Sequence, residues 1–213
     1  MRMSRVLSVS CALALGATAV AQQGSAPAAL VEIDRAALPV AVTDIVGVQQ
    51  RLFRDGRVFI GGQPSEAAFE RFKALGVTVV VNLRTQREMD NRQTVPFDEA
   101  AALAKLGLEY VHIPLGGDDN PWTPAAVERF ALALEQHRGP VLLHCAVAWR
   151  ASYLWAAYLI RYGGLDLDAA LARGRAIGIG RDPLEGLIGR PLKMEWADAP
   201  AAVSPVPAVA AKP

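Results

Sequence analysis

Between about Val46 and Trp196, short β-branched runs alternate with longer stretches in which apolar residues recur at helical spacing. The run at 77–83 is the clearest, and its near-continuous apolar character is typical of a strand buried on both faces of a parallel sheet. The longer stretches predict amphipathic helices, most of them ended by glycine or proline. The expected strands are residues 58–60, 77–83, 108–113 and 141–144, and the expected helices are 66–75, 96–106, 124–137 and 151–162.

This alternation predicts an α/β fold with a mainly parallel central sheet and helices on both faces. The 213 residues suit one domain, which we place at 46–196. Residues 22–45 and 197–213 are rich in alanine and proline and show no clear period. We interpret the first as a mobile leader and the second as a disordered tail.

The beginning of the chain has the pattern of a signal peptide. Two arginines precede an apolar run at 6–20, which ends in the small-x-small triplet Ala19-Val20-Ala21. The run is shorter than the ~20 residues that span a bilayer, which favours cleavage over an anchor. A lipoprotein site at Cys11 is the weaker alternative, because apolar sequence continues past that cysteine. We therefore expect 1–21 to be removed and the mature protein to be periplasmic or secreted, with no stable membrane insertion.

The composition is that of a packed globular protein, with 52% apolar and 20% charged residues and a formal net charge of +1. So small a charge gives no reason to expect a nucleic-acid partner. His112 and His137 are not spaced with other ligands, so neither a metal nor another cofactor is expected. Without residues 1–21 the chain has one cysteine, Cys145, and cannot form an internal disulfide. A lone cysteine is usually an inert buried thiol, but the neighbours of Cys145 favour chemistry.

The segment 144–152 reads His-Cys-Ala-Val-Ala-Trp-Arg-Ala-Ser and puts Cys145 at the carboxyl end of an expected strand, where such sheets bind ligands. Loop N–H groups and the start of the next helix would point at one anion there, and the same field favours a thiolate. Arg150 offers a planar set of donors for a phosphoryl group or another oxyanion. A nucleophile with an oxyanion clamp is the minimum for covalent chemistry at phosphorus or sulfur. The loop residues between them are Ala146, Val147, Ala148 and Trp149.

His144, Cys145, Arg150 and Ser152 together resemble the signature loop of cysteine-dependent protein phosphatases, above all the dual-specificity branch. Three upstream motifs are similar to bacterial phosphatase-like domains related to the beta-lactamase-hydrolase-associated domain. They are Gly-Gly-Gln-Pro-Ser at 61–65, Val-Val-Val-Asn-Leu-Arg at 79–84 and Tyr-Val-His-Ile-Pro at 110–114. The resemblance implies a hydrolase that acts on phosphate monoesters of a small molecule or a protein through a phosphocysteine, without a cofactor.

The resemblance also suggests roles for residues around the cysteine. Asp118 and Asp119 lie where phosphatases carry the acid that protonates the leaving group, with Asp119 preferred; alternatively they are simply turn residues. His144 would order the loop and support the thiolate. Ser152 would either donate to the thiolate or satisfy the first helical turn.

Arg84 follows the expected strand 77–83 and lies outside the loop from Cys145 to Arg150. It could contact substrate or pair at the surface with Glu88 or Asp90, and we favour the ion pair. Because Arg84, the two aspartates and Cys145 all follow strands, we expect three chemically capable segments to meet at one edge of the sheet.

Two features depart from the phosphatase signature. Four residues, rather than five, separate Cys145 from Arg150, as in the bacterial branch named above and in rhodaneses, which carry sulfur on a cysteine. Ala148 replaces the loop glycine, at a cost of ~1 kcal/mol if that position needs a positive φ. A sulfurtransferase working through a cysteine persulfide therefore stays open, as does a non-catalytic module that binds anions or senses thiol oxidation.

Overall fold

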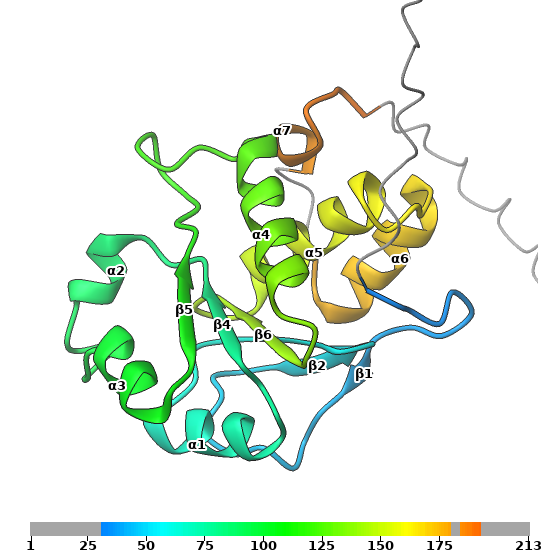
Figure 1. Cartoon of the computed structure of the whole chain (residues 1–213). Coiled ribbons are helices and arrows are strands. Elements are labelled where there is room, and N and C mark those ends of the chain that lie inside the picture. The colour runs from blue at the N-terminus through cyan, green and yellow to red at the C-terminus, as the bar shows by residue number, and fades with distance from the viewer. Residues whose placement is uncertain (1–30, 180–183, 193–213) are drawn as a thin grey trace, which may run out of the picture.

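The structure is a computed structural model of the chain, and it describes residues 31–179 and 184–192 (Figure 1). The expected signal peptide, the first part of the expected leader and the expected tail lie outside the described residues. Within the described ranges, no helix has both the length and the apolar character needed to cross a membrane.

A six-stranded mixed sheet forms the centre of the molecule, in the order β1-β2-β3-β6-β4-β5 (Figure 1). Its four parallel strands are β3 (Val58–Gly61), β6 (Val141–His144), β4 (Val79–Asn82) and β5 (Glu109–His112). The two antiparallel strands at one edge are β1 (Val40–Ala41) and β2 (Leu52–Asp55). The expected α/β fold with a mainly parallel sheet is confirmed.

Helices cover both faces of the sheet, as expected (Figure 1). The helices on one face are α1 (Glu66–Ala74) and α3 (Glu99–Leu106). Those on the other face are α4 (Pro124–Gln136), α5 (Trp149–Arg161), α6 (Leu167–Ile177) and α7 (Leu184–Ile188). Side chains alternate along each buried strand, so Val79 and Val81 pack under α4 and α5 while Val80 packs under α1 and α3.

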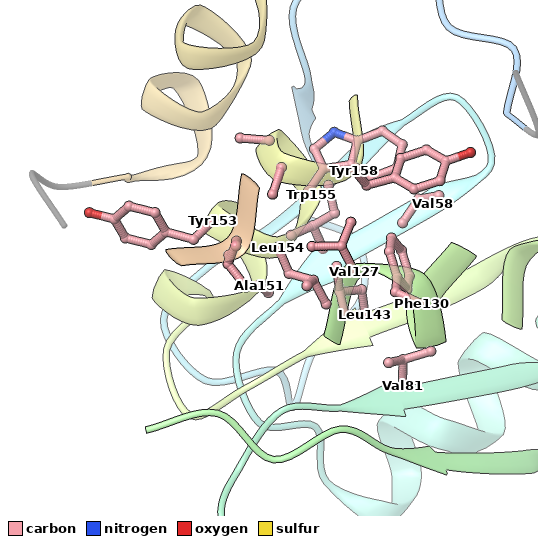
Figure 2. Packing of buried hydrophobic residues seen from close by; sticks show 14 of the residues in the cluster. Val58, Val81, Val127, Phe130, Leu143, Ala151, Tyr153, Leu154, Trp155 and Tyr158 are labelled. Atoms are coloured by element: carbon pink, nitrogen blue, oxygen red, sulfur yellow. The ribbon is translucent and has the colours of Figure 1, made fainter. Parts of the chain in front are cut away.

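The larger part of the core lies between the sheet and α5, which is buried along most of its length. Figure 2 shows Phe130 of α4 near Tyr158 of α5 and Val58 of β3, with the sheet residues Leu143 and Val81 below it. The rings of Trp155 and Tyr158 stack 5.4 Å apart, and Phe130 meets Tyr158 edge-on at 5.5 Å. This packing holds α5, and with it the loop that precedes it, firmly on the sheet.

The interpretation of residues 22–45 as a mobile leader is wrong for its described part, 31–45. Strand β1 pairs with β2, and the side chains of Val31 and Ile45 are buried. The guanidinium of Arg35 also donates to backbone carbonyls at the end of α5, 3.1 and 3.2 Å away. Isolated anchor positions of this kind leave no periodic pattern in the sequence, which is why the segment looked unstructured.

A short helix, α2 (Gln86–Asp90), lies in the segment 84–94, where the sequence analysis expected neither a helix nor a strand. It begins with a capping box: Thr85 accepts from the N–H of Glu88, and the Glu88 side chain accepts from the N–H of Thr85. Helix α5 also begins two residues earlier than expected, at Trp149. Arg150 therefore lies in its first turn.

Candidate active site

Cys145 follows β6 directly, at the carboxyl edge of the parallel strands. Its backbone N–H donates to the carbonyl of Gly61 on β3, at 3.2 Å, so the start of the loop stays attached to the sheet. The side chain is only 1% exposed, and it borders a cavity of about 380 Å³. The residues that line this cavity are Glu88, Leu115, Gly116, Trp122, Cys145, Ala146, Val147, Trp149 and Arg150.

The loop after Cys145 is fixed from both ends. The carbonyl of Ala146 accepts from the N–H of Gln63 at 3.0 Å, and Val147 bridges to Gly62. Ala148 then turns the chain into α5 with φ 69° and ψ −8°, which is the positive φ considered from the sequence. No side chain caps the first turn of α5, so its N–H groups can donate to an anion held in the loop.

Arg150 is clamped by Glu88, a residue that the sequence analysis treated only as a surface partner of Arg84. Its Nη1 and Nη2 each lie 2.6 Å from one oxygen of the Glu88 carboxylate. Nη1 also donates to the carbonyls of Leu115 and Leu83, at 2.9 and 3.3 Å. A guanidinium has five N–H donors, so this arrangement leaves the Nε–H and one Nη2–H for an oxyanion and for the Cys145 side chain, with which Arg150 also hydrogen-bonds. The capping box at Thr85 and Glu88 was a sequence signal for a helix start here, but no local pattern connects Glu88 with Arg150, 62 residues away.

The contact between Glu88 and Arg150 keeps both side chains charged. Burial would raise the pKa of the Glu88 carboxyl, but the bonds from Arg150 and Thr85 and the nearby charges outweigh it, and the pKa falls from 4.5 to about 2. Burial would likewise lower the pKa of Arg150, but Glu88 and the adjacent Cys145 side chain raise it overall. The guanidinium is therefore a permanent cation beside the thiol.

The two aspartates lie in an exposed turn between β5 and α4. Asp119 lines a second cavity, of about 720 Å³, which shares Glu88, Gly116 and Arg150 with the cavity at Cys145. Asp119 and Arg150 thus line the same cavity, whereas Asp118 lines neither of the two.

Ser152 and Trp149 occupy different places relative to the cavity. The Ser152 hydroxyl is buried and donates to the Trp149 carbonyl at 2.7 Å, which matches the helical-turn alternative. Trp149 is 42% exposed and packs edge-on against Tyr153 and Trp122, with ring centroids 5.0 and 5.8 Å apart. Of these three rings, Trp149 and Trp122 line the cavity at Cys145.

Each of the three histidines lies within hydrogen-bonding distance of a carboxylate or a backbone carbonyl. His144 is buried, with Nε2 3.1 Å from Glu99. His112 Nε2 lies 2.6 Å from the carbonyl of Arg84, and His137 Nε2 lies 3.1 Å from Glu109. In the part of the chain that the structure describes, no three His, Cys, Asp or Glu side chains are grouped as ligands for a metal ion.

Comparison with known proteins gives a consistent picture. A family described as DSP-PTPase phosphatase fused to NAD+ kinase matches residues 40–181. A beta-lactamase hydrolase-like protein of Xylella fastidiosa is 33% identical over 122 residues, which are 57% of this chain and 28% of that protein. A similar protein of Agrobacterium fabrum is 31% identical over 99 residues, 46% of this chain and 22% of that protein. The chain thus spans less than a third of the curated relatives it matches.

Two solved structures share the fold. P. aeruginosa TpbA in complex with pTyr has a TM-score of 0.51 at 23% identity, covering 67% of this chain and 82% of that one. PTPMT1 has a TM-score of 0.52 at 21% identity, covering 62% of this chain and 87% of that one. At these identities the likeness supports the architecture alone.

Proposed function

The chain belongs to the family of DSP-PTPase phosphatases, and from this premise we propose that it is an exported cysteine-dependent hydrolase that cleaves phosphate monoesters through a phosphocysteine on Cys145. One observation carries the proposal: Cys145 and Arg150 line the same cavity, and Arg150 is held there by Glu88 with N–H donors left over for an anion. A nucleophile and an oxyanion clamp that share a cavity are what phosphoryl transfer to a thiolate needs.

In the first step, the Cys145 thiolate attacks phosphorus while the bond between phosphorus and the leaving oxygen breaks. Arg150 and the loop N–H groups bind the equatorial oxygens, and Asp119 gives its proton to the departing oxygen. In the second step, Asp119 takes a proton from water, the water oxygen bonds to phosphorus, and the sulfur–phosphorus bond breaks. Inorganic phosphate leaves, and the thiolate and protonated Asp119 are restored.

Four variants test this mechanism with an aryl and an alkyl phosphate. Cys145→Ser and Arg150→Lys should abolish turnover, because serine cannot supply a thiolate nucleophile and lysine cannot bind two oxygens in the bidentate way of arginine. Asp119→Asn should lower kcat by roughly 10²–10⁴-fold, the usual share of general acid catalysis, with less loss for the aryl ester. Asp118→Asn is the matched control and should retain kcat, since Asp118 does not line either cavity.

The same proteins should be assayed with thiosulfate and cyanide. A persulfide cycle needs no acid at position 119, so cyanide-dependent turnover that survives Asp119→Asn would indicate a sulfurtransferase instead. Full phosphatase activity in Cys145→Ser would contradict the mechanism altogether.

Export is a separate part of the proposal and rests on the sequence pattern of residues 1–21. The intact mass of protein from the periplasmic fraction should correspond to a chain that begins near Gln22. Recovery of the uncut chain, and only from detergent-solubilised membranes, would contradict export with cleavage.

A further inference from the structure

A buried carboxylate lies beneath the candidate active site and is not part of it. Glu99, in the first turn of α3, is 2% exposed and receives side chains from the ends of three parallel strands. Gln63 Nε2 donates to one of its oxygens at 2.6 Å, while Asn82 Nδ2 and His144 Nε2 lie 2.9 and 3.1 Å from the other. Asn82 and His144 are direct partners in the sheet register, which explains why both reach one oxygen.

These contacts keep Glu99 ionised. Burial would raise the pKa of its carboxyl, but the attraction of His144 and the hydrogen bonds from His144, Gln63 and Asn82 outweigh burial and lower it. An ionised carboxylate can only accept hydrogen bonds, so His144 must donate through Nε2. His144 immediately precedes Cys145 in the chain, and the bond to Glu99 therefore fixes the backbone at the start of the catalytic loop.

A second branch leads from Glu99 to Arg150. The amide oxygen of Gln63 accepts from Nη1 of Arg84 at 2.9 Å, and Nε of Arg84 lies 3.4 Å from the Glu88 carboxylate. Arg84 is 4% exposed, and its backbone N–H donates to the side-chain oxygen of Asn82 at 2.8 Å. Glu88 in turn holds Arg150 through two bonds. Negative and positive groups thus alternate along a chain of contacts from Glu99, by way of Gln63, to the guanidinium at the cavity.

We propose that Glu99 is a positioning residue for both halves of the catalytic pair, fixing Cys145 through His144 and Arg150 through Gln63, Arg84 and Glu88. It touches neither substrate nor thiol. The inference rests on the proposed function in that it takes Cys145 and Arg150 as the pair that works on phosphate. Most of the buried polar groups in this network are hydrogen-bonded, with His144 Nδ1 and Arg84 Nε as the two exceptions. The bonds that are made favour one arrangement of these side chains, which suits a positioning role.

The test compares Glu99→Gln with Leu103→Ala, which changes a buried apolar side chain of the same helix. Both variants should be less stable than the natural protein, so both are measured at a temperature where each is folded. The readout is protection of Cys145 from iodoacetamide by inorganic phosphate, which requires no turnover. We expect Glu99→Gln to raise the half-protecting phosphate concentration about 10-fold or more, as small misplacements at a site typically do, and Leu103→Ala to leave it unchanged.

A second variant covers the case in which Glu99→Gln does not fold. Gln63→Met breaks the branch to Arg84 but leaves the bond between Glu99 and His144 in place. It should weaken phosphate protection while the alkylation rate without phosphate stays near that of the natural protein.

The outcomes separate the two proposals. The inference fails if phosphate protects Cys145 equally well in Glu99→Gln and in Leu103→Ala, or if Gln63→Met leaves the half-protecting phosphate concentration unchanged. Glu99 is then a structural residue, even when the natural protein hydrolyses phosphate esters. If the natural protein hydrolyses no phosphate ester but the variants lose protection as expected, the proposed function fails while the positioning role of Glu99 stands.

Discussion

Ala148 holds a backbone conformation that a side chain disfavours, with φ 69° and ψ −8°. Because glycine adopts it without a steric cost, we expect Ala148→Gly to raise the free energy of unfolding by about 1 kcal/mol. Ala146 does not have a positive φ, so Ala146→Gly, its matched control, should lower the free energy by giving the unfolded chain more freedom. Urea unfolding of both variants measures the difference, and equal shifts would contradict the assignment of strain to residue 148.

Glu88 should leave a signature in the acid stability of the protein. Its pKa in the folded state, about 2, lies below the ordinary value of 4.5, so the carboxylate stabilises the fold fully above about pH 4.5 and loses that effect as pH falls towards 2. Glu88→Gln should therefore flatten the decline in unfolding free energy across this window. Glu70→Gln, on an exposed part of α1, is the control and should follow the natural protein. A parallel decline in the Glu88 variant would argue against the clamp.

At the level of whole elements, α6 is tied to the sheet by a buried ion pair. Nη1 of Arg173 lies 2.7 and 2.8 Å from the two carboxylate oxygens of Asp55, at the end of β2. The indole N–H of Trp155, on α5, donates to the same carboxylate at 2.9 Å. Arg173 is 2% exposed and Asp55 5%, so one carboxylate joins a strand and two helices away from water.

Removing that carboxylate should be costly. Asp55→Ala leaves the Arg173 cation buried without its partner, and we expect a loss of about 3–5 kcal/mol in unfolding free energy. The double variant Asp55→Ala with Arg173→Met should lose less, because the charge is removed with its partner. Urea unfolding of the natural protein, Asp55→Ala, Arg173→Met and the double variant tests this, and a loss in the double variant equal to the sum of the two single losses would show that the pair is not coupled.

The elements that the sequence predicted are those with a strong local pattern. The four parallel strands and helices α1, α3, α4 and α5 combine clear periodicity with capping or breaking residues, so their positions were anticipated to within a few residues. β1, β2, α2, α6 and α7 were not, and three of them show the physical reasons. A two-residue strand has no period, α2 is announced only by its capping box, and α6 is anchored by an ion pair whose partner lies 118 residues away.

On the scale of the whole molecule, the candidate active site and the buried carboxylate of Glu99 lie on opposite faces of the sheet, at the same edge. The side towards α5 carries the cavity with Cys145 and Arg150, whereas the side towards α3 carries the buried carboxylate of Glu99. The sequence located the first, because the cysteine, the arginine and the loop are contiguous. It could not locate Glu88 or Glu99 as partners of the cradle, since both come from distant segments and only tertiary packing brings them to Arg150 and His144.

Residues 31–45 belong to the folded unit, and their removal should show this. A chain that begins at Val46 loses β1 and the buried side chains of Val31 and Ile45, and burial of two such side chains contributes about 3–6 kcal/mol. We therefore expect its unfolding free energy to fall by that amount relative to a chain that begins at Gln22. Val31→Ala should reproduce part of the loss, whereas Val40→Ala, at an exposed position of β1, should have little effect.

Where the shortened chain stays folded, alkylation of Cys145 should still be blocked by phosphate, because the residues that line its cavity all follow residue 87. Equal stability of the two chains would mean that residues 31–45 contribute nothing to the core.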